Sequence, residues 1–200
     1  MVFDPRGVGP QLSRRALIGG AAAATVAGLG PAEADAPEAV KGAAPRFELV
    51  LNVNGVDHTV AVEPQAMLAE VLRGPLKLTG TKIACMRGAC SACTVWLDGE
   101  PIPSCMMLAI EVGARKITTI EGLARGDELH PVQEAFLDHD ALQCGYCTPG
   151  MAMAAAALLE RNPNPTETDV KEAISGHVCR CGTYPHVVAA TLAAARARKG

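Results

Sequence analysis

Few aromatic residues, no excess of basic charge and no long apolar run distinguish this sequence of 200 residues. The net charge of -3 excludes the basic face that nucleic-acid binding requires. With 3% aromatic residues, the core must be built from aliphatic and alanine side chains, and two small cores of that kind need additional staples. The composition is otherwise that of an ordinary globular protein. The eight cysteines are the candidate staples.

The first 36 residues have the pattern of an export signal. Arg14 and Arg15 precede a weakly apolar run over 16–29, and small residues of the Ala-x-Ala kind follow around Ala34. Paired arginines before such a run are typical of the twin-arginine route, which carries folded proteins. The run is too short and too rich in Gly and Ala for a comfortable membrane span, although a retained anchor is an alternative. We therefore expect a periplasmic protein that folds before export.

After a linker over 37–45, strand-like patterns occupy the first half of the chain, residues 46–121. The pairs Asn54-Gly55 and Asp98-Gly99 each predict a tight hairpin turn between two strands. The expected strands are 47–52, 56–62, 94–97, 101–104 and 115–120, with a helix over 67–72 between the hairpins.

The second half, residues 122–200, is predicted to be entirely helical. We expect one helix opened by Pro131, one capped by Thr148, one begun by a capping box at Thr166 and a last one over 187–195. The Met and Ala residues of the second helix are interpreted as core packing, because small residues let helices approach closely and Met fills gaps. The chain is therefore α+β, and each half carries four cysteines.

The first cysteine set forms a Cx4CxxC loop, with a fourth member on the following hairpin. Its members are Cys85, Cys90, Cys93 and Cys105. This spacing is that of plant-type ferredoxins, in which four thiolates hold a 2Fe-2S cluster. The small residues between the cysteines keep bulk away and let backbone N–H groups point at the sulfurs. Zinc suits three thiols in one short loop less well.

The second set consists of a CxxC pair and a CxC pair beside predicted helix ends. Its members are Cys144, Cys147, Cys179 and Cys181. Zinc, a redox dithiol and secretory disulfides are alternatives for such a set. The CxC partners are too close for an unstrained mutual bridge, and no βαβ pattern surrounds the CxxC pair. Four cysteines in two close pairs therefore indicate a metal core.

Both sets and their flanks resemble the small iron-sulfur subunit of the xanthine dehydrogenase and aldehyde oxidase family of molybdenum hydroxylases. The resemblance covers about residues 47–194. The matching segments are 78–82, 85–93, 94–99, 104–105, 143–151, 175–176 and 179–181. It implies a β-grasp ferredoxin-like domain followed by a four-helix domain, each with one 2Fe-2S cluster bound by its four cysteines. It also implies a separate large subunit that holds molybdopterin, which Gln143 approaches.

The sequence departs from the family at three places. Ala84 and Ser91 stand where the family usually has Gly, which alters backbone freedom around the first cluster. After Cys181 the chain reads Gly182-Thr183-Tyr184, where many relatives have Thr-Gly-Tyr. This form is similar to the isoquinoline oxidoreductase branch, whose partners lack flavin, and it favours a cytochrome c over a flavin (FAD) subunit as acceptor.

The resulting hypothesis is an electron-transfer subunit without a substrate-converting site of its own. The large partner would oxidise an aldehyde or an N-heterocycle with oxygen from water, and electrons would pass from the helical cluster to the ferredoxin-type cluster. The alternatives are a zinc-stapled exported interaction module and a disulfide-stapled secreted domain.

The five histidines are not expected to be ligands. We expect polar or helix-start positions for His58 and His130, and surface or capping positions for His139, His177 and His186. His177, two residues before Cys179, is also a candidate for tuning the potential of the neighbouring cluster.

Overall fold

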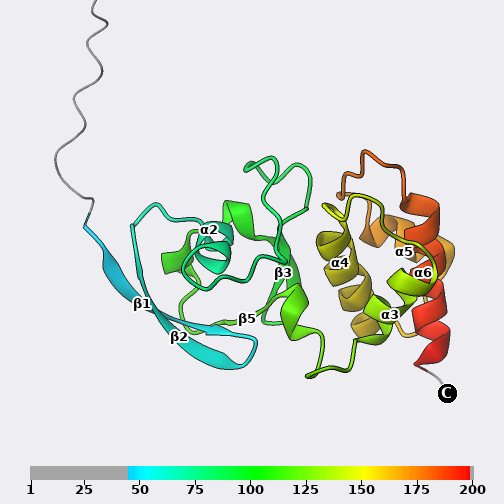
Figure 1. Cartoon of the computed structure of the whole chain (residues 1–200), viewed down its shortest axis with the longest axis horizontal. Coiled ribbons are helices and arrows are strands. Elements are labelled where there is room, and N and C mark those ends of the chain that lie inside the picture. The colour runs from blue at the N-terminus through cyan, green and yellow to red at the C-terminus, as the bar shows by residue number, and fades with distance from the viewer. Residues whose placement is uncertain (1–44, 199–200) are drawn as a thin grey trace, which may run out of the picture. The chain divides into compact units, whose positions relative to one another are not determined.

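The computed structural model describes residues 45–198. The predicted leader over 1–36 and nearly all of the predicted linker lie outside this range. The described residues belong to one unit, in which a sheet half is followed by a helical half (Figure 1). Within residues 45–198, no helix has both the length and the apolar character needed to span a bilayer.

The first half contains a mixed five-stranded sheet with the order β2-β1-β5-β3-β4. The strands are β1 (Phe47–Val53), β2 (Val56–Val62), β3 (Thr94–Leu97), β4 (Glu100–Pro103) and β5 (Lys116–Thr118). Only the β1–β5 pairing is parallel. Both predicted hairpins are confirmed, because Asn54 and Asp98 adopt the positive φ values, 53° and 52°, that such turns require.

Helix α2 (Leu68–Arg73) covers one face of this sheet and completes its core. Leu68 and Leu72 are buried against Leu51, Val95 and Ile117. The expected helix over 67–72 is thus confirmed with a shift of one residue. A single helix packed on a mixed sheet is the β-grasp arrangement that the family resemblance implied.

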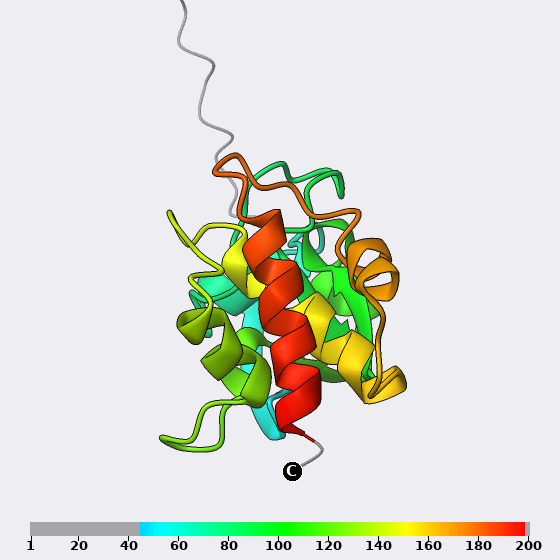
Figure 2. The same cartoon turned by 90° about the vertical axis from the view of Figure 1, so that its right-hand side faces the viewer.

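The second half contains four α-helices, which Figure 2 shows with α6 in front. They are α3 (Pro131–Asp138), α4 (Thr148–Arg161), α5 (Glu167–Ala173) and α6 (Tyr184–Ala197). Met151, Met153 and the alanines 154–157 of α4 are almost fully buried. The interpretation of these residues as core packing is therefore confirmed.

One of the predicted helix caps is confirmed and one is wrong. Thr166 Oγ1 accepts the N–H of Asp169, whose carboxylate accepts the N–H of Thr166, so the capping box exists. Helix α4, however, has Cys147 as its N-cap, with φ −83° and ψ −18°, and Thr148 is already helical. The backbone at Cys147 starts the helix one residue early, and Thr148 Oγ1 is buried without a hydrogen-bond partner among the described residues.

Helix α6 also starts earlier than predicted. It begins at Tyr184 and has Pro185 in its first turn, a position that proline favours. The apolar periodicity that marked 187–195 is only the buried part of this helix, whereas Tyr184 and Pro185 are exposed.

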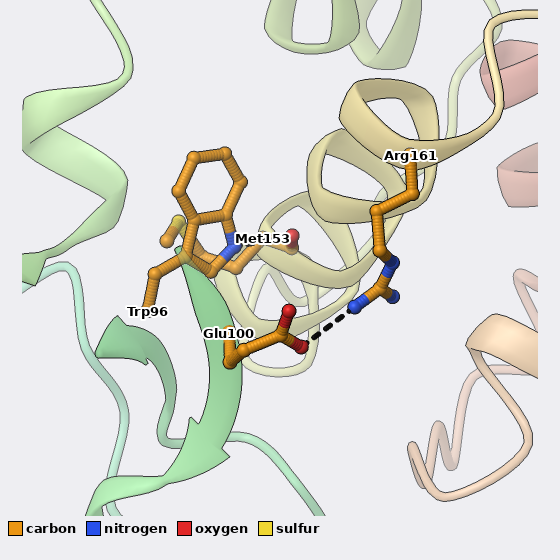
Figure 3. Close-up of polar contacts among 4 residues, drawn as sticks. All are labelled: Trp96, Glu100, Met153 and Arg161. Atoms are coloured by element: carbon orange, nitrogen blue, oxygen red, sulfur yellow. Dashed lines mark hydrogen bonds and ion pairs between the residues drawn. The ribbon is translucent and has the colours of Figure 1, made fainter. Parts of the chain in front are cut away.

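Trp96 on β3 joins the two halves of the chain (Figure 3). Its indole Nε1 donates to the carbonyl oxygen of Met153 on α4 at 2.9 Å. Nearby, Arg161 Nη1 lies 2.8 Å from Glu100 Oε2, but these side chains are 50% and 69% exposed. An ion pair with such exposed side chains contributes at most about 1 kcal/mol to stability. The partly buried indole of Trp96 therefore stabilises this junction more than the ion pair does.

The start of α3 should make stability depend on pH. His130 Nδ1 accepts the N–H of Val132 at 3.2 Å, and only the unprotonated nitrogen can do so. Burial, followed by the charge of Arg198, lowers the pKa of His130. A lowered folded-state pKa contributes stability above the unfolded value of about 6.5 that is lost as the pH falls through the folded value. We expect the thermal midpoint to fall accordingly below about pH 6.5.

Asparagine at position 130 is the control, because it caps a helix without titrating. As the pH falls below about 6.5, the thermal midpoint of the wild type should fall relative to that of His130→Asn. A difference that stays constant from about pH 5 to pH 8 would contradict this role.

Candidate functional site

The first cysteine loop lies between α2 and β3, and its fourth member lies in a 3-10 turn, η1 (Ser104–Met106). Cys93 directly precedes β3, and the Ser104 hydroxyl donates to its carbonyl at 2.6 Å. The backbone N–H of Cys105 donates to Cys93 Sγ at 3.4 Å. The hairpin β3–β4 thus brings together cysteines 12 positions apart. Cys93 and Cys105 are buried, whereas Cys85 and Cys90 are partly exposed.

The thiols of this loop are in two different electrostatic environments. Hydrogen bonding from the Arg87 backbone, then from the Cys90 thiol, lowers the pKa of Cys85 to about 7. Burial is the main reason that the pKa of Cys93 rises to about 11. The partly exposed Cys85 thiol therefore has donors that dominate its pKa, whereas the donors at the buried Cys93 thiol do not offset the effect of burial.

The second set is formed by the loops that precede α4 and α6. Cys147 is the N-cap of α4, and Cys179 and Cys181 lie just before α6. Burial raises the pKa of Cys147 to about 11. Burial also acts to raise the pKa of Cys179, but hydrogen bonds from the hydroxyl and backbone of Thr183 outweigh it and lower the value to about 7. Thr183 Oγ1 lies 3.2 Å from Cys179 Sγ.

Both tyrosines of the chain fix the cysteine loops through their hydroxyl groups. Tyr184 accepts the N–H of Cys179 at 2.7 Å and donates to the carbonyl of His177 at 3.1 Å. Tyr146, inside the CxxC pair, donates to the carbonyl of Ile83 beside the first loop. Sequence reasoning assigned neither tyrosine a role, although a hydroxyl next to a cysteine pair was a signal that could have found them.

The cysteine thiols act on one another in pairs. In addition to the Arg87 backbone, the Cys90 thiol lowers the pKa of Cys85. In addition to burial, Cys105 raises the pKa of Cys93, and Cys179 and Cys144 raise the pKa of Cys147. Among residues 45–198, no group of three or more His, Cys, Asp or Glu side chains is arranged to hold a metal ion. A 2Fe-2S core needs four thiolates, two on each iron, and the paired sulfurs fit this donor set.

The two cysteine regions are in direct contact. The backbone N–H of Val178 donates to the carbonyl of Cys90 at 3.2 Å, which joins the CxC loop to the ferredoxin-type loop. At Gly150 on α4, an added Cβ would lie only 2.3 Å from the carbonyl oxygen of Ser91. The loops before β3, α4 and α6 gather at the same end of the molecule in both views (Figures 1 and 2).

Gln143 and His177, for which the sequence suggested roles, differ in exposure. Gln143 is exposed beside Cys144, so its side chain is accessible to a partner. His177 is 8% exposed, so its expected surface or capping position is wrong: its imidazole packs at the contact between the loops, 3.2 Å from Thr94 Oγ1. Burial lowers its pKa.

The other histidines are more exposed. His139 is the C-cap of α3, and its carbonyl lies 3.0 Å from Nδ1 of the exposed His186. His130 caps α3 as a helix-start residue.

Ser91 is held in a left-handed conformation, with φ 53°, in the middle of the first loop. A residue with a Cβ pays about 1–2 kcal/mol there, and glycine does not. We expect Ser91→Gly to stabilise the protein by about 1 kcal/mol and to raise its thermal midpoint by roughly 2–4 °C. The midpoints should be compared at equal iron content.

Ser91→Ala is the matched control, because alanine keeps the Cβ and loses only the hydroxyl. It should give no gain in thermal midpoint. Equal gains for glycine and alanine would show that the hydroxyl, and not the backbone, is the source of the strain.

Two family models match the chain, one in each half. Residues 51–118 match a 2Fe-2S iron-sulfur cluster binding domain. Residues 119–192 match a second model, described as a 2Fe-2S binding domain.

Known proteins resemble the chain over nearly all of the described part. The nicotine 6-hydroxylase small subunit of Paenarthrobacter nicotinovorans is 49% identical over 74% of this chain and 88% of that protein. The aldehyde oxidoreductase iron-sulfur-binding subunit of Escherichia coli O157:H7 is 38% identical over 90% of this chain and 86% of that protein. A chain of quinoline 2-oxidoreductase from Pseudomonas putida 86 superposes with a TM-score of 0.74 and 41% identity, covering 78% of this chain and 99% of its own length.

Proposed function

The chain belongs to the family of small iron-sulfur subunits of molybdenum hydroxylases, and from that premise we propose that it relays electrons out of a large molybdopterin-binding partner. The observation that carries the proposal is the direct contact between two separate four-cysteine sets, Val178 N–H to Cys90 carbonyl. A single binding module needs only one set, whereas a relay needs two in contact.

Eight thiolates hold the cofactors in this proposal. One cluster takes Cys85, Cys90, Cys93 and Cys105, and the other takes Cys144, Cys147, Cys179 and Cys181. Each 2Fe-2S cluster, when bound, accepts one electron and passes it on. The paired sulfurs, the buried Cys93, Cys105 and Cys147 and the small residues between the cysteines support this assignment.

The remaining residues shape these sites and take no part as acid, base or nucleophile. Thr183 Oγ1 lies within hydrogen-bond distance of Cys179 Sγ, and the Cys105 N–H points at Cys93 Sγ. Hydrogen bonds to cysteine sulfur stabilise the more negative, reduced state of a site. In the helical half, Cys179 Sγ therefore accepts hydrogen bonds from its surroundings, whereas Cys147 Sγ is buried.

The electron count fixes what the relay must do. Hydroxylation of an aldehyde or an N-heterocycle with the oxygen of water releases two electrons and two protons for each substrate molecule. The electrons leave the partner singly through the helical set and then the ferredoxin-type set. The exposure of Cys144 and Gln143 supports this order, because it leaves the helical set open to a partner subunit.

A cytochrome c is the proposed acceptor, in place of a flavin subunit. The Gly182-Thr183-Tyr184 sequence after Cys181 supports it. The purified complex should contain no flavin and should reduce a cytochrome c in the presence of substrate. Stoichiometric FAD in the complex would contradict this acceptor.

Export through the twin-arginine route is proposed for the leader over 1–36. The pair Arg14-Arg15 before an apolar run supports it. In cell fractionation, the wild-type chain should appear in the periplasm, and a chain with lysine at both arginine positions should stay in the cytoplasm. Equal periplasmic amounts of the two would contradict the proposal.

Substrate-driven reduction tests the relay itself. The chain is purified with its large partner, and an aldehyde or an N-heterocycle is added without dithionite. Signals of both clusters should develop in the electron paramagnetic resonance (EPR) spectrum of the complex. With the isolated chain, the same substrates should produce no signal, and a signal there would contradict the division of labour.

A further inference from the structure

A buried side-chain hydrogen bond connects the two cysteine regions. His177 Nε2 lies 3.2 Å from Thr94 Oγ1, and the two residues are 8% and 6% exposed. The Thr94 hydroxyl also donates to the carbonyl of Ser91 at 2.7 Å. A hydroxyl has one proton, so His177 must donate from Nε2, and a chain of hydrogen bonds runs from His177 through Thr94 to Ser91.

Two residues of this hydrogen-bonded series, Thr94 and His177, stand close in sequence to proposed ligands of the two sets. Thr94 follows Cys93 directly, and His177 stands two positions before Cys179. Val178, which directly follows His177, makes the backbone hydrogen bond to the carbonyl of Cys90. The side-chain bond therefore lies next to the backbone bond that joins the two sets.

The backbone of His177 is fixed independently of its ring. Its N–H donates to the carbonyl of Ile174 at 2.9 Å, and its carbonyl accepts the Tyr184 hydroxyl at 3.1 Å. The Val178 side chain, by contrast, is 58% exposed and cannot hold the loop against its neighbour by packing. The imidazole is thus the side chain of this segment that reaches the ferredoxin-type half.

We propose that His177 is a positioning residue that holds the CxC loop against the ferredoxin-type loop and thereby sets the electronic coupling between the two cysteine sets. The inference rests on the proposed electron-relay function. It assigns His177 neither to iron nor to a proton transfer. Its action is to keep Val178 N–H in contact with the carbonyl of Cys90.

The physical reason is the steep distance dependence of electronic coupling. Coupling through a hydrogen bond is much stronger than coupling across an open gap. The Val178–Cys90 contact is 3.2 Å long, and a small outward shift of an exposed loop would open it to water. Because buried hydrogen bonds exclude water and resist such a shift, the His177–Thr94 bond controls the contact without being part of it.

The test uses the full chain with both clusters bound, reduced with dithionite. Magnetic interaction between the two reduced sites splits their EPR lines, and the exchange part of this splitting, taken after subtraction of the distance-dependent dipolar part, depends on the contact between them. His177→Phe removes the donor, and Thr94→Val removes the acceptor with almost no change in shape. Each substitution should reduce the splitting several-fold while two signals remain, and the double variant should reduce it no further.

His177→Gln is the rescue variant, because its amide N–H can still donate to Thr94, and it should restore most of the splitting. Unchanged splitting in both His177→Phe and Thr94→Val, with both signals at full intensity, would overturn the inference. Loss of one signal in every variant, glutamine included, would also overturn it, since His177 would then only hold its own loop. Absence of two signals in the wild type would instead overturn the proposed function.

Discussion

Replacing Gly150 by alanine is expected to lower stability by about 2–3 kcal/mol, which is roughly 5–10 °C in thermal midpoint. The added Cβ would lie 2.3 Å from the carbonyl oxygen of Ser91 and 3.3 Å from the backbone of Ala92. These are backbone atoms, so α4 or the first cysteine loop must move. Helix propensity acts the other way and favours alanine by about 1 kcal/mol, so a net loss of stability can come only from the clash.

Gly176→Ala is the matched control for this substitution. Gly176 lies in the same contact region, but there an added Cβ would be 3.5 Å from Ser91 Oγ, an ordinary contact distance. The control should leave the thermal midpoint within about 2 °C of wild type. Equal midpoints for the two variants would show that the close approach of α4 to the loop is not needed for stability.

Removing one cysteine from each set in turn should show which EPR signal belongs to which cluster. Cys105→Ala removes a buried member of the first set, and Cys181→Ala removes an exposed member of the second. A 2Fe-2S cluster needs four thiolates, so each variant should lose one of two signals and retain about one spin per chain. The two variants should lose different signals.

Each of these variants serves as the control for the other. The retained signal in Cys105→Ala should have the same line positions as the signal missing from Cys181→Ala. Loss of the same signal from both variants would contradict the assignment of the cysteines to two sets. Survival of both signals in either variant would exclude that cysteine as a ligand.

Much of the fold could be predicted because local chemistry determines it. The turns at Asn54-Gly55 and Asp98-Gly99 need a positive φ, which these residues adopt at low cost. The capping box at Thr166 satisfies its own backbone groups, so a short sequence pattern is enough to find it. The start of α4 was missed because Cys147, a poor capping residue by type, takes that position in a loop shaped by its neighbours.

The cysteines could be predicted from spacing, but the contact between their loops could not. The hydrogen bond of Thr94 with His177 joins residues 83 positions apart, and that of Tyr146 with Ile83 joins residues 63 apart. Long-range contacts of this kind arise from the packing of α4 against β3 and leave no periodic signal. A histidine before a CxC pair was therefore read as a surface residue, although it is buried.

The central claim is that this chain holds two 2Fe-2S clusters, and EPR spectroscopy with spin quantitation tests it most directly. The purified full chain is reduced with dithionite, and its iron and zinc contents are measured on the same sample. The account predicts two distinguishable S = 1/2 signals that sum to about two spins per chain. A silent spectrum from a colourless, iron-free protein that contains zinc would contradict it and favour a zinc-stapled module.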